Sequence, residues 1–321
     1  MKHRMTSRMN VLAGLLLAAN ACIAQQFPDR PIRIVVPYAP GSVSDATIRL
    51  IGNKMEAQLG QPVIMENRPG AAAMIGATVV AQGPADGYSL LWTSPAAISK
   101  VFVKSPPFDV RTDLAPVSAM CMSAHVLAVN ISLPVKTLPE FVNHVKKNPG
   151  RLNYAQSANS TMLPMEFFKQ VAGLDIVGVP YKGAAPANTA IVSGEVQAIF
   201  GLLTTFRPLE AAGKVRVLAG TFPRRPPAAP DVATFSELGY PDMVFPQTTT
   251  FLARSAVPAD RLTKLSGVMT GIVGLPDVAK PCIDAGGETL TIQGAPLQKH
   301  VNDEIDRWGA AAVRAKFQPT E

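Results

Sequence analysis

Hydrophobic and polar positions along the chain alternate between two periods, which predicts strands followed by helices. Residues 32–37 form a run, apolar except for Arg33, of the kind that a parallel sheet buries on both faces. Residues 45–59 follow with apolar positions spaced for one face of a helix. The same pattern recurs in 62–93 and in 137–219. We therefore expect an α/β fold with right-handed crossovers between parallel strands.

Two long apolar stretches, 114–130 and 243–253, interrupt this alternation, and each is expected to carry the chain between two lobes. A cleft between two lobes is a favoured ligand site. The expected later elements are helices at 258–273, 276–285 and 296–316 and a short strand at 290–293. The expected parts are a signal peptide at 1–24, lobe 1 at 25–120 plus 245–321, and lobe 2 at 121–244.

The first 24 residues have the three-part pattern of a secretory signal peptide. A basic start without acids (1–8) precedes an apolar run (11–19) that is too short to span a bilayer permanently, and small residues follow. We expect cleavage after Ala24 and a mature protein in the periplasm. Acylation at Cys22, as in a lipoprotein, is the alternative.

The charge of the chain does not alter the expected fold and gives no indication of a charged partner. The formal net charge of +7 falls to +4 when the three basic residues of the leader are removed, and no stretch clusters the remaining excess. Binding to nucleic acid needs a basic stripe, so we expect no nucleic-acid partner. We expect a monomer, no cofactor and no metal.

No catalytic constellation is visible in the chain. Nucleophile elbows, zinc-protease motifs and phosphate loops are absent from the sequence. After the leader the histidines are His125, His144 and His300, and each is expected to be structural or solvated. Cys121 and Cys282 are then the remaining thiols, and either a disulfide or two buried free thiols is compatible with the sequence.

The turn after the first predicted strand leads into a helix, which aims the N–H groups of the first helical turn beyond the strand's end. Anions are favoured there. Ser44 or Asp45 can cap this helix, and a ligand carboxylate can share the same helix start. The candidate residues of this corner are Tyr38, Ala39, Pro40, Gly41, Ser42, Val43, Ser44 and Asp45.

A second strand-to-helix corner follows the strand predicted at 152–155 and consists of Ser157, Ala158, Asn159, Ser160 and Thr161. Capping of the helix by Ser160 or Thr161 is the alternative interpretation. One such corner in each lobe favours a shared binding cleft. A third segment, after the strand predicted at 176–179, consists of Tyr181, Lys182, Gly183 and Ala184.

Several longer motifs resemble the Bug-type solute-binding receptors of tripartite tricarboxylate transporters. They include FPDRPIRIVVPY at 27–38, ENRPGA at 66–71, PADGY at 84–88, PGRLNYA at 149–155 and VPYKG at 179–183. The resemblance implies the two-lobed periplasmic-binding-protein fold (type II-like). It also implies closure on a small carboxylated solute, by hinge motion at crossings near Cys121 and Pro246, and delivery to integral-membrane permease subunits.

The resemblance also implies which residues bind the ligand. In the family, the loops that correspond to 38–45 and 157–161 hold a ligand carboxylate. More variable positions contact the far end of the ligand, and by position these are Ser94, Pro95, Tyr181, Lys182, Gly183, Ala184, Gly201 and Leu202.

Four positions depart from the family pattern. Ser42 stands for a glycine, Met162 for a histidine, Gln197 for an aspartate and Gly201 for an acidic residue. The hypothesis is that the far end of the site has lost polar groups and takes a larger or less charged ligand than an amino acid.

The function we expect is a non-catalytic periplasmic receptor. The alternatives are an exported enzyme with Lys182 or Asp45 as base, a sensory receptor without a dedicated permease, and an adhesive protein.

Overall fold

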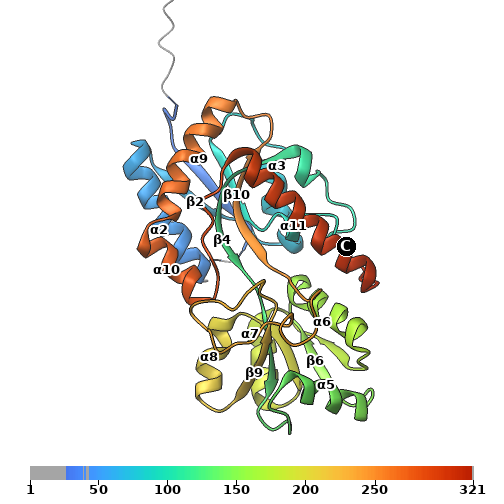
Figure 1. Ribbon diagram of the computed structural model, residues 1–321. Coiled ribbons are helices and arrows are strands. Elements are labelled where there is room, and N and C mark those ends of the chain that lie inside the picture. Colours follow the sequence, from blue (N-terminus) through green and yellow to red (C-terminus); the bar gives the residue numbers. More distant parts are fainter. Residues whose placement is uncertain (1–26, 39, 41–42, 320–321) are drawn as a thin grey trace, which may run out of the picture.

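The computed structural model describes residues 27–38, 40 and 43–319. In that part of the chain two five-stranded sheets form an upper and a lower lobe, each with helices on both faces (Figure 1). The expected two-lobed α/β fold is confirmed. The predicted signal peptide lies outside the described residues. None of the described helices combines the length and the apolar character that a membrane crossing needs.

The first sheet has the strand order β2-β1-β3-β10-β4. The first three strands are parallel, and β10 runs antiparallel between β3 and β4. The strands are β1 (Ile32–Val36), β2 (Val63–Asn67), β3 (Ser89–Thr93), β4 (Leu114–Ser123) and β10 (Gln247–Arg254). On one face lie α2 (Val43–Leu59), α9 (Ala259–Val273) and α10 (Pro276–Asp284), and on the other α3 (Met74–Ala81) and α11 (Gly294–Arg314).

The second sheet has the strand order β7-β6-β8-β5-β9, with β6, β7 and β8 parallel and β5 antiparallel to β8 and β9. The strands are β5 (Val126–Asn130), β6 (Asn153–Gln156), β7 (Val177–Pro180), β8 (Ala198–Gly201) and β9 (Val215–Gly220). One face carries α5 (Leu138–Lys147) and α6 (Asn159–Ala172), and the other α7 (Ala184–Ser193) and α8 (Leu203–Ala211). The short helix α4 (Val110–Asp113) precedes β4.

Two elements differ from the sequence-based expectation. The strand expected at 290–293 is absent, because only Glu288 pairs with the end of β4, in a single bridge to Met122, while Leu290 and Ile292 pack against the core. Helix α8 was not expected. The assumed domain boundaries at 120 and 244 stay predictions.

The chain passes between the lobes twice, at the first crossing (residues 123–125) and the second crossing (residues 244–246). Val126, at the start of β5, pairs with the last residues of β8 and β9, Gly201 and Gly220. In lobe 1, Thr250 of β10 lies opposite Thr93, so the start of β10 extends beyond the end of β3. Both crossings therefore run at the carboxyl ends of the parallel strands, and these two sheet edges face each other.

The first crossing is anchored covalently. Cys121 of β4 and Cys282 of α10 form a disulfide, which decides between the two alternatives left open by the sequence. Met122 and Glu288 exchange two backbone hydrogen bonds of 2.8 Å beside it. A Cβ at Gly287 would lie 2.8 and 2.9 Å from the two sulfurs, so the lack of a side chain there permits the packing.

The second crossing is anchored by α11. The Trp308 indole N–H donates to the Pro246 carbonyl at 3.1 Å, and the Thr248 N–H donates to the Glu304 carboxylate at 2.9 Å. The Thr248 hydroxyl also lies 2.8 Å from Nε2 of His300. Trp308 is fully buried.

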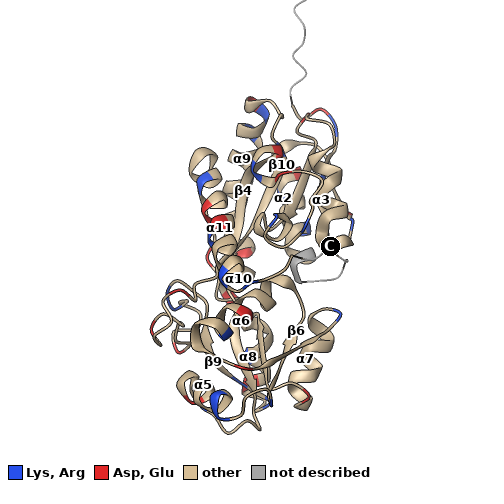
Figure 2. Cartoon of the chain, turned by 90° about the vertical axis from the view of Figure 1, so that its right-hand side faces the viewer, with Lys and Arg blue, Asp and Glu red and all other residues tan. Residues whose placement is uncertain are grey.

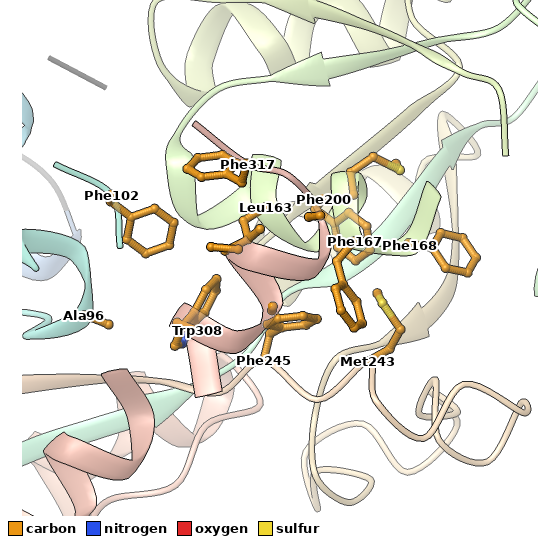
Figure 3. Packing of buried hydrophobic residues seen from close by; sticks show 14 of the residues in the cluster. Ala96, Phe102, Leu163, Phe167, Phe168, Phe200, Met243, Phe245, Trp308 and Phe317 are labelled. Carbon is orange, nitrogen blue, oxygen red and sulfur yellow. The ribbon is translucent and has the colours of Figure 1, made fainter. Parts of the chain in front are cut away.

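An aromatic cluster joins the lobes beside the second crossing. Phe102 and Trp308 of lobe 1 lie edge to face, Trp308 contacts Phe245 of the crossing, and Phe245 contacts Phe167 of α6 in lobe 2. Figure 3 shows these rings in one layer between α11 and α6. The buried core on this side is therefore continuous from one lobe to the other.

Candidate ligand-binding site

The lobe 1 edge of the candidate site is formed by the ends of β1 and β3. The Tyr38 hydroxyl lies 2.8 Å from the Thr93 hydroxyl, and the Asn67 amide donates to the Tyr38 carbonyl at 3.0 Å. The Tyr38 ring packs edge to face on Trp92, which is buried. Tyr38 is thereby held over the carboxyl end of β3.

The turn between β1 and α2 lies only partly within the described residues. Ala39, Gly41 and Ser42 fall outside them, and Pro40 is exposed. Helix α2 begins at Val43, so Ser44 and Asp45 lie inside its first turn. The capping of this helix, for which the sequence suggested Ser44 or Asp45, lies outside the described residues.

Ser94 and Pro95 continue from β3 toward the second lobe. Ser94 is 3% exposed, and its hydroxyl has no hydrogen-bond partner in the described part of the chain. The same holds for the hydroxyl of Thr250, which lies opposite Thr93 on β10. Buried polar atoms without protein partners indicate positions that water or a ligand satisfies.

The lobe 2 corner, residues 157–161, opens α6 without a capping side chain. The N-cap residue is Ala158, and the Thr161 hydroxyl donates to the Ala158 carbonyl at 2.9 Å while lying 3.2 Å from the Ser157 hydroxyl. Capping by Ser160 or Thr161 was therefore a wrong alternative. The first-turn N–H groups of α6 receive no side-chain acceptor from the N-cap, although helix starts commonly have one.

Two more helices begin at the same sheet edge in the same way. Helix α7 has Gly183 as N-cap and α8 has Leu202, and neither provides a capping hydrogen bond. These helices follow β7 and β8, the two neighbours of β6. Three positive helix ends are thus gathered along three adjacent strands. By contrast, α5, which starts at the opposite edge, is capped by Thr137.

The lobe 2 corner contacts the lobe 1 segment that follows Ser94. The side-chain amide of Asn159 donates to the Phe102 carbonyl at 3.3 Å, which links the start of α6 to lobe 1. The structure thus brings the residues after β3 and those after β6 to the same side of the crossings.

Other predicted site residues are placed differently. The Tyr181 hydroxyl donates to Glu195 at 2.6 Å, so it is directed away from the edge, toward the loop before β8. Lys182 and Ala184 are exposed, as is Leu202 (43%). A Cβ at Gly201 would lie 2.8 Å from the Phe206 ring.

One of the four departures from the family pattern, Gln197, lies away from the candidate site, while the hypothesis about the ligand stays a prediction. The Gln197 side chain accepts from the Asn153 N–H at 2.8 Å and donates to the Gly194 carbonyl at 2.9 Å. Gln197 precedes β8 and lies at the opposite edge from Gly201, so it supports the backbone and changes nothing at the candidate site. Met162 is half-buried and packs against the core.

A groove of about 500 Å³ lies elsewhere, between α11 and residues 99–111. It contains no predicted site residue. Its rim charges are paired within the protein, Lys100 with Asp109 and Arg111 with Asp306. We therefore do not assign the ligand to this groove.

The charge pattern and the polar clusters bear on two other kinds of site. Lys and Arg positions are interspersed with Asp and Glu in both lobes, without a basic stripe in the view of Figure 2. No group of three or more His, Cys, Asp and Glu side chains suited to a metal occurs in the described ranges. Burial lowers the pKa of His125 to about 4, so its imidazole is neutral near pH 7.

Comparison with known proteins decides the family. Residues 47–315 match the model of the tripartite tricarboxylate transporter family receptor, TctC. The chain belongs to this receptor family. BugT of Bordetella pertussis is 30% identical, over 96% of this chain and 97% of its own length.

Two solved structures of the family hold dicarboxylates. Rpa4515 of R. palustris with adipate is 30% identical and superimposes with a TM-score of 0.81, over 92% of this chain and 100% of that one. MatC of Rhodopseudomonas palustris with bound malate is 28% identical, with a TM-score of 0.76, over 89% of this chain and 99% of that one. The family consists of periplasmic solute-binding receptors rather than enzymes, and the resemblance found in the sequence is confirmed.

Proposed function

We propose that this protein is an exported periplasmic receptor that captures a small carboxylated solute between its lobes. It then delivers the solute to integral-membrane permease subunits of the tripartite tricarboxylate type. The ligand carboxylate is received by the corner at 157–161, with Tyr38 and Ser94 on the opposing edge. The remaining residues of the 38–45 turn, the 181–184 segment and Gly201–Leu202 complete the proposed site.

The observation that carries this proposal is the group of three helix starts without capping side chains. Uncapped N–H groups and the positive end of the helix dipole favour an anion. Ala158, Gly183 and Leu202 cannot supply a carboxylate or hydroxyl of their own. A carboxylate from a ligand fits this requirement, and the relatives that hold adipate and malate support the same class of ligand.

A calorimetric titration of the mature protein with adipate, malate and benzoate tests the proposal, with adipamide as the uncharged control. At least one acid is expected to bind saturably and to raise the melting temperature, while adipamide does neither. Binding of adipamide as tightly as adipate, or binding of none of the acids, contradicts the proposal. Chemical change of the bound acid would instead favour an enzyme.

A matched pair of variants tests the helix starts. Ala184→Pro removes one first-turn N–H of α7, and proline is tolerated at this position of a helix. Ala184 is exposed, and the preceding Gly183 has an extended ψ of 179°, which suits a following proline. Ala184→Ser keeps the N–H and serves as the control. The proline variant is expected to bind the acid about tenfold more weakly, because a hydrogen bond to a charged group contributes roughly 1.5–3 kcal/mol. Equal affinity of the proline and serine variants would show that the start of α7 does not contact the ligand.

A further inference from the structure

A buried tyrosine hydroxyl lies directly behind the two lobe 2 segments of the proposed site. Tyr154 on β6 is fully buried, and its hydroxyl donates to the Glu166 carboxylate on α6. The same oxygen accepts from the side-chain amide of Gln156 at 2.6 Å. Tyr154 and Gln156 are two residues apart on one strand, so their side chains share the face that α6 covers.

Gln156 connects both segments through its backbone. It is the last residue of β6, and the 157–161 corner begins immediately after it. Its carbonyl accepts the Tyr181 N–H at 2.8 Å, which fixes the start of the 181–184 segment. A displacement of Gln156 would therefore move two separate parts of the proposed site together.

Gly178 on the neighbouring strand provides the space for this arrangement. It lies opposite Tyr154 in the register of β6 and β7. A Cβ at this position would lie 2.1 Å from the Gln156 amide nitrogen and 2.9 Å from the Tyr154 oxygen. Any side chain at 178 would have to displace the Gln156 amide.

Glu166 is held in place from the other side. The Lys169 ammonium lies 3.0 Å from the carboxylate and 5.7 Å from the centre of the Tyr154 ring. Burial, and secondly the hydrogen bond to Glu166, raise the pKa of Tyr154, so the hydroxyl keeps its proton and remains a donor. The direction of the hydrogen bonds is then fixed from Gln156 to Tyr154 to Glu166.

We propose that Gln156, Tyr154 and Glu166 form a positioning relay that holds the 157–161 and 181–184 segments in register for ligand binding. None of the three is required to touch the ligand. The effect of the relay on ligand affinity rests on the proposed function. The positioning of the two segments by the relay is independent of that function.

Hydrogen exchange measured by mass spectrometry tests the relay without any ligand. Tyr154→Phe and Gln156→Met are each expected to speed exchange about tenfold in both segments, the factor for one hydrogen bond lost. Glu166→Ala should do the same, while Glu166→Gln, which keeps an acceptor oxygen, should stay close to wild type. Tyr240→Phe, which removes a half-buried hydroxyl of lobe 2 outside the relay, is the control.

Faster exchange in both segments, with other lobe 2 peptides unchanged, supports the relay. A change in neither segment, in one of them alone, or uniformly throughout lobe 2 overturns it. The last pattern would show a general loss of stability.

Titration with adipate then separates the relay from the proposed function. Tyr154→Phe and Gly178→Ala are each expected to weaken adipate binding about tenfold, and the double variant no further, because both act on the Gln156 amide. If the losses of binding free energy in the two single variants add in full in the double variant, the two residues do not share one relay. A wild-type protein that binds no acid refutes the proposed function, while the exchange experiment still decides the relay.

Discussion

The two crossings between the lobes are held by different kinds of interaction. The first is fixed by the Cys121–Cys282 disulfide and a backbone bridge, whereas the second is held by side chains of α11, among them Trp308 and Glu304. A disulfide resists changes of pH and packing but depends on the redox environment. The second crossing depends on packing and on an ionisable group. The two crossings therefore depend on two independent conditions.

The largest expected effect is on the packing of the second crossing. Trp308→Ala removes a fully buried indole from the aromatic cluster and should lower the free energy of unfolding by about 3–5 kcal/mol. Trp308→Phe keeps a ring but loses the hydrogen bond to Pro246, and a smaller loss is expected. Denaturant unfolding measures both. Equal stability of Trp308→Ala and wild type would show that α11 does not anchor the crossing.

Removal of the covalent anchor is expected to have the next largest effect. The disulfide closes a loop across a sequence separation of 161 residues, and its loss should cost about 2–4 kcal/mol, mainly because the unfolded chain gains freedom. Replacing both cysteines by alanine should lower the melting temperature, and reductant should lower that of wild type but not of the variant. Sensitivity of the variant to reductant would contradict this explanation.

A third prediction concerns pH at the second crossing. Burial raises the pKa of Glu304 to about 7, against an ordinary value of 4.5. The folded protein thus binds this proton more tightly than the unfolded chain, so the contribution of Glu304 to stability is greatest below pH 4.5 and falls by up to about 3 kcal/mol as the pH rises through 7. Glu304→Gln should abolish this fall, as measured by denaturant unfolding from pH 4.5 to 8.

His125 at the first crossing provides the contrast for that measurement. Its pKa is lowered from 6.5 to about 4, so its contribution to stability is present above pH 6.5 and is lost as the pH falls. Between about pH 4.5 and 6.5 the two residues therefore act with opposite slopes. The two contributions therefore largely cancel in wild type, so His125→Gln should expose a fall in stability with rising pH in this range, whereas Glu304→Gln should expose a rise. Two identical profiles would show that neither group is responsible.

The sequence predicted the lobes well because their strands and helices follow simple periods. Residues 258–273 were expected as a helix, and α9 spans Ala259–Val273. The start of α6 was misjudged, since the usual preference for polar N-caps pointed to Ser160 or Thr161 and the N-cap is Ala158. Helix α8 was missed because its first residues, Leu203 and Thr204, directly follow a strand and show no start signal.

For the candidate site, the sequence predicted the two strand-to-helix corners but not the interactions that surround them. Two cysteines far apart in sequence do not reveal their pairing, although Gly287 beside Cys282 is explained once the pair is known. The family pattern placed Gln197 among the positions at the far end of the ligand. A position in a sequence pattern does not show at which end of a strand the side chain lies. Tyr154 and Gln156 carried a usable signal, since both lie on one strand face and the paired strand has a glycine opposite.

The insertion of β10 between β3 and β4 has a consequence for how the protein is made. Lobe 2 uses strands from one uninterrupted stretch of chain, but the first sheet lacks a middle strand until residues 247–254 have emerged. Until then β3 and β4 have no partner along their facing edges, and such open edges resist stable folding on their own. Lobe 1 of a polypeptide built in this order therefore stays incomplete until most of the chain has been synthesised.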